Sequence, residues 1–224
     1  MKKMFYKTSL IEYNFSLFNS TNLEDISYMF ADTLIDEFSL NGLKINKVIN
    51  MSHLFENCNS LKSVDFLFFD TKNVKDMSYM FHSCSLIKSI DFNDIDTSNV
   101  INMSNMLRDC IFLEDLKFKN IDSSKVEDIS YMFHSCFSLR DLDLSNFNTS
   151  SVKNMLNTFL SCSSLTSLNL NNFNTKNVES TSGLFSSCER LKEIDIANFD
   201  FRSNKDMSKM FYNCKSLTKI NINR

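Results

Sequence analysis

Apolar residues recur along this chain with a fixed period of 26 residues. Cysteines mark the period, because each lies 26 residues after the one before it. Leucine or phenylalanine stands three residues before each cysteine, and leucine or isoleucine three residues after it. Self-similarity of this kind is typical of a solenoid, in which each repeat contacts only its neighbours. The cysteines are Cys58, Cys84, Cys110, Cys136, Cys162, Cys188 and Cys214.

The first half of each repeat has the apolar spacing of a helix. Met77, Met80, Phe81 and Cys84 fall at positions i, i+3, i+4 and i+7, and Asp76 precedes them. This spacing places the four side chains on one helix face, and aspartate is a favourable N-cap residue. We therefore predict that each repeat begins with a short helix of about two turns.

The second half of each repeat reads L-x-x-L-x-L-x-x-F, as in Leu165, Leu168, Leu170 and Phe173. The alternation of Leu168 and Leu170 predicts a short strand, and the spacing matches the leucine-rich repeat core. The predicted fold is an α/β solenoid of the leucine-rich-repeat type: a stack of eight units, each a short helix plus a short strand in one parallel sheet. An N-terminal cap segment, 1–21, precedes the repeat solenoid, 22–224. The predicted units are 22–46, 47–72, 73–98, 99–124, 125–150, 151–176, 177–202 and 203–224.

Two stretches of the repeat carry a family resemblance. They are Asp-Met-Ser-Tyr-Met-Phe-His-Ser-Cys at 76–84 and Leu-Asp-Leu-Ser-Asn-Phe-Asn-Thr-Ser at 142–150. The repeats at 22–224 resemble the BspA-like leucine-rich repeats of bacterial surface proteins, in the 25–26-residue variant found in mycoplasma-type lipoproteins and known as a domain of unknown function. The resemblance implies an exported or cell-surface protein that attaches to host proteins or other cells, and it brings no catalytic residues.

Outward-facing strand positions form the candidate binding face. Successive side chains of a strand point to opposite sides of a sheet, so the residues that flank the buried leucines face solvent. These positions are mainly acidic. Simple solvation of an exposed face explains them, and so does a recognition surface. A calcium site is disfavoured, since its six to eight oxygens must converge on one point. The candidate residues are Asp65, Asp91, Asp115, Lys117, Lys119, Asp141, Asp143, Asn169, Glu193 and Asp195.

The cysteine and histidine columns have a structural interpretation. No two cysteines are closer than 26 residues, which does not fit the paired spacing of zinc ligands. Stacking of neighbouring repeats leaves a disulfide between their cysteines as an alternative, but on an apolar face we expect buried, reduced thiols. His82 and His134 lie two repeats apart, too far to share a metal, and with His53 they are expected on exposed helix faces. We predict no metal and no cofactor.

Composition and charge narrow the function classes. The net charge of −3 gives no electrostatic basis for binding nucleic acid. Only two glycines are present, which leaves no glycine-rich phosphate loop, and no nucleophile–base constellation stands out. We expect a protein that is not an enzyme: a protein-binding or adhesion solenoid of a cell-surface repeat protein, with host and cell-surface proteins as candidate partners. The alternative is an intracellular scaffold that binds a protein partner.

The chain offers no segment for membrane insertion. No run approaches 18 uninterrupted apolar residues, and residues 1–20 lack the continuous apolar stretch of a signal peptide. Location at the cell surface or in secreted material is therefore expected from the family resemblance alone. A cytoplasmic location is the alternative, since the unpaired thiols suit a reducing compartment.

Overall fold

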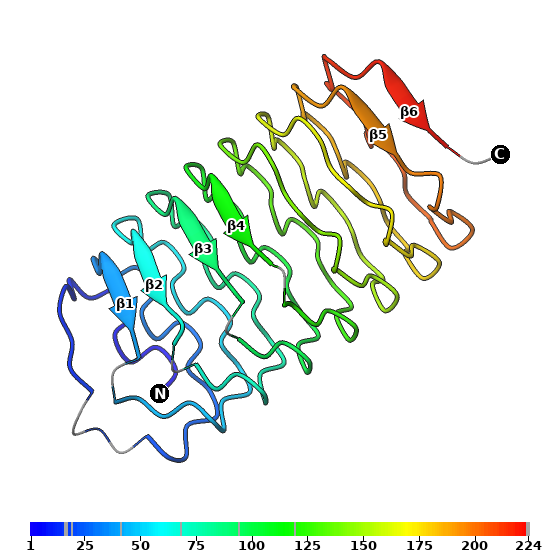
Figure 1. Ribbon diagram of the computed structural model, residues 1–224. Coiled ribbons are helices and arrows are strands. Elements are labelled where there is room, and N and C mark those ends of the chain that lie inside the picture. Colours follow the sequence, from blue (N-terminus) through cyan, green and yellow to red (C-terminus); the bar gives the residue numbers. More distant parts are fainter. Residues whose placement is uncertain are drawn as a thin grey trace.

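The computed structural model describes residues 1–15, 18, 20–40, 42–67, 69–93, 95–118 and 120–222. The chain winds into a row of stacked coils that follow one another in sequence order along a single axis (Figure 1). Each repeat is one coil, so the prediction of a leucine-rich-repeat-type solenoid is confirmed.

Short strands lie along one side of the solenoid, which we call the strand face (Figure 1). Neighbouring strands are parallel, and Ile90 lies opposite Leu116. The described strands are β1 (Glu37–Ser39), β2 (Ser63–Asp65), β3 (Ser89–Asp91), β4 (Asp115–Lys117), β5 (Glu193–Asp195) and β6 (Lys219–Asn221).

The prediction of one continuous parallel sheet is wrong. Among the described residues, the strands form three two-stranded sheets, with β1 beside β2, β3 beside β4 and β5 beside β6. Residues 141–143 and 167–169 occupy the equivalent places in the coils between β4 and β5, but they are not paired as strands. A strand of three residues forms few ladder hydrogen bonds, so a small shift between coils interrupts the ladder.

Consecutive tight turns replace the predicted helices, and no helix occurs in the described part of the chain. Within residues 77–84, the N–H of Met80 donates to the carbonyl of Met77, and that of Cys84 to the carbonyl of Phe81. These bonds span three residues, whereas an α-helix spans four. Tyr79 and Ser83 have φ angles of 56° and 61°, which a right-handed helix excludes. We call residues 77–84 and their equivalents the turn segments.

Every second N–H group of a turn segment donates to the next coil. Those of Met77, Tyr79, Phe81 and Ser83 reach carbonyl oxygens of the following repeat at 2.8 to 3.0 Å. A segment of eight residues forms too few internal bonds to be stable as a helix, whereas the turns give these N–H groups partners within the coil or on its neighbour. Two successive turns bring the apolar side chains to one side of the segment, as a helix would. The apolar face was therefore predicted correctly, but the backbone conformation was not.

The residues predicted as helix N-caps hold turns instead. Asp76 Oδ1 accepts the N–H of Ser78 at 2.9 Å, which closes an Asx turn at the start of the segment. The same column pairs backbone to backbone along the solenoid, in parallel bridges from Asp25 to Asp206. Capping-type residues therefore marked the correct positions, although they start turns and not helices.

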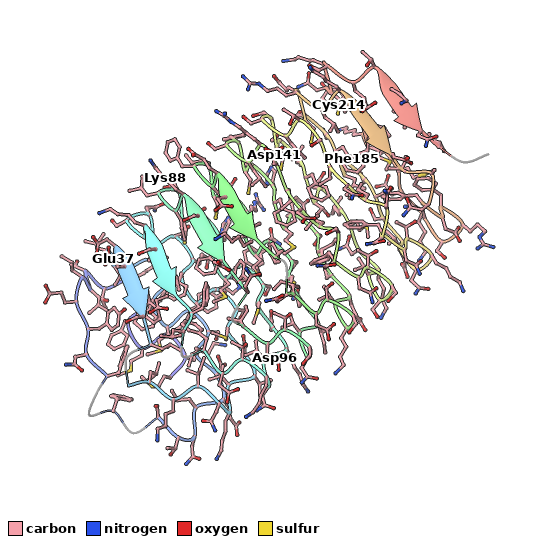
Figure 2. All side chains as sticks on the ribbon, in the orientation of Figure 1. Glu37, Lys88, Asp96, Asp141, Phe185 and Cys214 are labelled. Atoms are coloured by element: carbon pink, nitrogen blue, oxygen red, sulfur yellow. The ribbon has the colours of Figure 1, made fainter. Side chains whose placement is uncertain are left out.

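A continuous apolar core fills the solenoid. Phenylalanine rings stack from coil to coil, and Phe133, Phe159 and Phe185 have centroid separations of 5.4 and 5.7 Å with nearly parallel planes. Figure 2 shows Phe185 inside the coils, whereas Lys88 and Asp141 follow one outer edge and Asp96 lies at the opposite edge.

Residues 1–8, within the segment predicted as a cap, form another turn segment against the first repeat. Lys3 and Lys7 have φ angles of 59° and 58°, as in the later coils, and the N–H of Phe5 donates to the carbonyl of Met29 at 3.0 Å. Phe5 also stacks on Phe30 at 5.5 Å. This segment covers the apolar end of the first predicted repeat.

Candidate functional site

Nine of the ten candidate binding residues lie exposed on the strand face, and Lys119 lies outside the described residues. Three belong to β3 and β4, where Asp91, Asp115 and Lys117 flank the buried Ile90 and Leu116. The other six extend the same columns into the coils before and after these strands. The face thus places side chains of different repeats in rows at the spacing of the coils.

The acidic column at the ends of the strands has a local structural cause that sequence reasoning missed. Asp91 Oδ1 accepts the N–H of Asn93 at 3.0 Å, and Asp195 Oδ1 accepts the N–H of Ala197 at 2.9 Å. Each bond closes the turn that follows the strand. The signal was present in the sequence, because the column holds aspartate or asparagine in every coil except those of Ser39 and Lys117. The same bond is formed by Asp65, Asp143 and Asn169.

Basic and amide groups partly balance these carboxylates. Lys117 Nζ lies 3.3 Å from Asp91 Oδ2, and Lys219 Nζ lies 3.4 Å from Glu193 Oε2. The Ala197 N–H and the amide of Asn221 hold the pKa of Asp195 below its usual range. Because the ion pairs are exposed, they contribute little to stability, but they fix a mixed charge pattern on the face.

A shallow hollow of about 360 Å³ opens on the strand face near its C-terminal end. We call it the strand-face hollow. Leu168 and Ile194 form its apolar base, and Glu193, Asp195 and Lys219 stand around it. The candidate residues Asn169, Glu193 and Asp195 are therefore brought together here. Asp65, at the other end of the face, lines a second hollow with Tyr13 and Glu37.

The cysteines are free, and all but the half-buried Cys214 are buried, as predicted. Each thiol also donates to a main-chain carbonyl of the preceding coil; Cys84 Sγ, for example, lies 3.1 Å from the oxygen of Phe55. Burial raises the pKa of Cys58 to about 11 and that of Cys162 to about 12. These thiols are structural, since the reactive form of cysteine is the thiolate.

A comparison of the sequence with known protein families assigns this chain to one of them. The sequence model of a family described as "Mycoplasma protein of unknown function, DUF285" matches residues 1–65, 36–139 and 111–223. The chain belongs to this family. The match extends over both ends of the described chain and confirms the resemblance to the mycoplasma-type repeats. No curated protein matches the DUF285 chain significantly.

Several solved structures show a distant likeness to the DUF285 chain. A leucine-rich repeat protein from Bacteroides ovatus is 18% identical, with a TM-score of 0.37 over 88% of this chain and 64% of that one. The leucine-rich repeat protein of T. pallidum is 17% identical, with a TM-score of 0.37 over 86% and 69%. One from Leptospira interrogans is 14% identical, with a TM-score of 0.38 over 90% and 49%. The DUF285 chain thus spans between half and about two thirds of their lengths, and likeness this distant says nothing of function.

The three histidines that we expected on exposed helix faces are half-buried on the turn segments of the DUF285 chain, and His53 and His82 form a cluster there. His53 Nδ1 is 2.9 Å from Glu56 Oε2, and His82 Nδ1 is 3.1 Å from Glu56 Oε1. Burial opposes ionisation of Glu56, but the two histidines hold its pKa at about 2. The His53 ring also stacks between Tyr28 and Tyr79, at 4.1 and 4.5 Å. Sequence reasoning missed this cluster because its members come from different repeats.

The described residues contain no group of three or more histidine, cysteine or acidic side chains arranged to hold a metal ion. Within the same residues, no helix is long and apolar enough to cross a membrane.

Proposed function

We propose that the DUF285 chain is a non-enzymatic, protein-binding solenoid that acts in adhesion at the cell surface and contacts its partner through the strand face. One observation carries this proposal: side chains of seven successive repeats meet on one exposed face without an intervening loop or helix. Extended surfaces of this kind are what solenoid repeats offer to protein partners. Location at the surface is supported by the family resemblance.

The strand face is suited to a partner that carries both signs of charge. A row of basic residues at its edge, which includes Lys62, Lys88 and Lys192, runs beside the acidic columns. Asx turns and ion pairs already order several of these side chains, so less side-chain entropy is lost on binding. The strand-face hollow adds apolar contact area at the base formed by Leu168 and Ile194.

Variants of the middle of the face test the contact surface. Asp115, Asp141 and Glu193 share a column in which other repeats carry serine, so their joint replacement by serine uses residues that the fold already accepts. The control replaces three acidic residues of another column, Glu24, Glu127 and Glu179, by glutamine. Both triple variants remove three charges, and circular dichroism checks that both fold.

Binding is measured with immobilised chain against surface proteins biotinylated on intact host cells, and against cytosolic extract of the source cells. We expect retention of host-surface proteins by the native chain and the control, and at least tenfold less retention by the strand-face variant. Equal retention by all three chains refutes the strand face as the contact surface.

Location is tested separately, by treating intact source cells with a membrane-impermeant amine reagent. Labelling of the chain before lysis supports the surface role. Labelling only after lysis refutes it and favours the alternative, an intracellular scaffold with a protein partner. The seven free thiols are the observation that favours this alternative, because reducing compartments preserve them.

A further inference from the structure

A further hollow, of about 430 Å³, opens on the turn segments of the last three repeats. We call it the turn-face hollow. Gly183 lines it, in a column that holds tyrosine, histidine or asparagine in the earlier coils. The carboxamide of Asn157 lies where a Cβ of residue 183 would stand. A volume of this size is in the range of pockets for small ligands.

A neighbouring column is emptied in the same coil. Ser186 stands where earlier repeats carry Glu56, His82, Arg108 and His134. Its side chain is only 4% exposed and lines the turn-face hollow. Its hydroxyl has no hydrogen-bond partner among the described residues. The Oγ atom is reached from the hollow, so a ligand seated there can form a hydrogen bond with it.

The other serines of the turn-face hollow are already engaged. Ser182 Oγ and Ser208 Oγ lie 2.8 Å apart, and Ser187 Oγ accepts from the amide of Asn213 at 3.3 Å. Their arrangement keeps the hollow polar at its sides. Ser186 is therefore the group left to bind a hydroxyl or carbonyl of an incoming molecule.

The walls of the turn-face hollow restrict the chemistry of that molecule. Leu160 adds an apolar side chain to the lining, and Tyr212, 65% exposed, adds an aromatic ring. Lys209 is the charged residue of the lining, and no acidic residue lines the hollow. An aromatic face suits the C–H face of a saturated ring, the hydroxyl and amide suit ring hydroxyls, and the ammonium group suits a carboxylate.

We propose that the turn-face hollow binds a sugar unit that bears a carboxylate, such as a uronic acid. Ser186 and Asn157 hydrogen-bond ring hydroxyls, Lys209 pairs with the carboxylate, and Tyr212 stacks on the ring. The proposal does not depend on the strand face. It adds a small-molecule site to the opposite part of the repeat.

Calorimetry and saturation-transfer NMR on the full chain test this site with glucuronic acid, glucose and inorganic phosphate. We expect glucuronic acid to bind at least tenfold more tightly than glucose, because glucose lacks the carboxylate. A disaccharide that ends in glucuronic acid distinguishes a glycan from the free sugar as the source. Equal binding of glucose and glucuronic acid, or binding of phosphate alone, overturns the proposal.

Three variants locate the binding. Gly183→Asn fills the turn-face hollow: the backbone suits asparagine, since Asn105 and Asn157 hold the same position with φ angles of 56° and 54°, and the Asn157 carboxamide must turn aside to admit the new Cβ. We expect it to abolish binding, Lys209→Gln to weaken it about tenfold and Ser186→Ala about fivefold, in line with the loss of one charged or one neutral hydrogen bond. Lys192→Gln, on the strand face, is the control and leaves binding unchanged. Unaltered binding by Gly183→Asn places the sugar elsewhere and refutes the site.

Discussion

Glycine at position 161 is expected to give a more stable chain than alanine if the turn geometry is correct. Ser161 is half-buried and has a φ angle of 62°, and its N–H donates to the carbonyl of Ser186 at 2.8 Å. In this left-handed region a Cβ costs about 1–2 kcal/mol, a cost that glycine avoids. The glycine variant loses more chain entropy on folding, by about 0.4–1 kcal/mol. We therefore expect Ser161→Gly to be more stable than Ser161→Ala by about 1 kcal/mol.

The helix that the apolar spacing suggests predicts the reverse order. In a helix interior, alanine is more stabilising than glycine by about 1 kcal/mol. The two geometries therefore differ by about 2 kcal/mol in the comparison of the two variants. This difference is large enough to be read from the midpoints of urea unfolding curves followed by circular dichroism.

A control position lies two residues further along the same coil. The described Ser163 does not share the positive φ angle of Ser161, and its N–H donates to the carbonyl of Ser161 at 2.8 Å. Ser163→Ala is expected to be at least as stable as Ser163→Gly, because no Cβ penalty applies there. The reasoning fails if alanine is also the more stabilising residue at Ser161, with unchanged slopes of the unfolding curves.

Three further predictions concern thiols, charge and the core. Iodoacetamide at pH 8 should alkylate the native chain first at the half-buried Cys214, because burial keeps the other thiols protonated. Peptide mass spectrometry measures the order of alkylation, and equal labelling of all seven cysteines would contradict the prediction. The pKa of Glu56 is about 2 in the folded chain against an ordinary value of 4.5, so its contribution to stability is present above pH 4.5 and is lost as the pH falls towards 2. Glu56→Gln should flatten this part of an acid-unfolding curve, and an unchanged curve would count against the His53–Glu56–His82 cluster. Phe133→Ala should destabilise the chain by about 3–5 kcal/mol in the same urea assay. Phe211→Ala should destabilise it by clearly less, because Phe211 lies in the more open last coil. Equal losses of stability would mean that the last coil is as well packed as the centre.

Much of the fold could be predicted because the stacking of repeats amplifies weak signals. Met77, Phe81, Cys84 and Leu168 are all buried, as the period of their columns indicated. The period fixes the number of residues in each coil, whether the backbone within the coil is a helix or a series of turns. The apolar face of the turn segments was therefore predicted correctly while their backbone was not.

The backbone of the turn segments was not predictable from apolar spacing alone. Two tight turns and a two-turn helix bring the same side chains to one side, so Met77, Met80 and Cys84 fit both. The better signal was the polar residue type at left-handed positions, such as Asn57 and Asn105, since asparagine tolerates a positive φ angle. Tyrosine at Tyr79 hides this signal, because its strain is compensated by bonds to the next coil.

The candidate face was located correctly in space, but part of its acidic character was attributed to the wrong cause. Asp65, Asp91 and Asp195 accept turn N–H groups, so the fold itself requires an aspartate or asparagine there. Contacts between repeats, such as the one between His82 and Glu56, depend on side-chain positions that a single repeat does not reveal.

Positions that vary within a column are therefore the better guide to specific binding in this chain. Columns with one residue type have a structural explanation in every case that can be traced: cysteine thiols donate to carbonyls, and threonines such as Thr97 donate to the next coil at 3.0 Å. Lys117 departs from the aspartate and asparagine that dominate its column, and it changes the charge of the strand face. Gly183 and Ser186 lie in columns whose residue type changes from coil to coil, and both line the turn-face hollow. Because such positions serve no bond that every coil repeats, their side chains can specify a ligand without disturbing the stack.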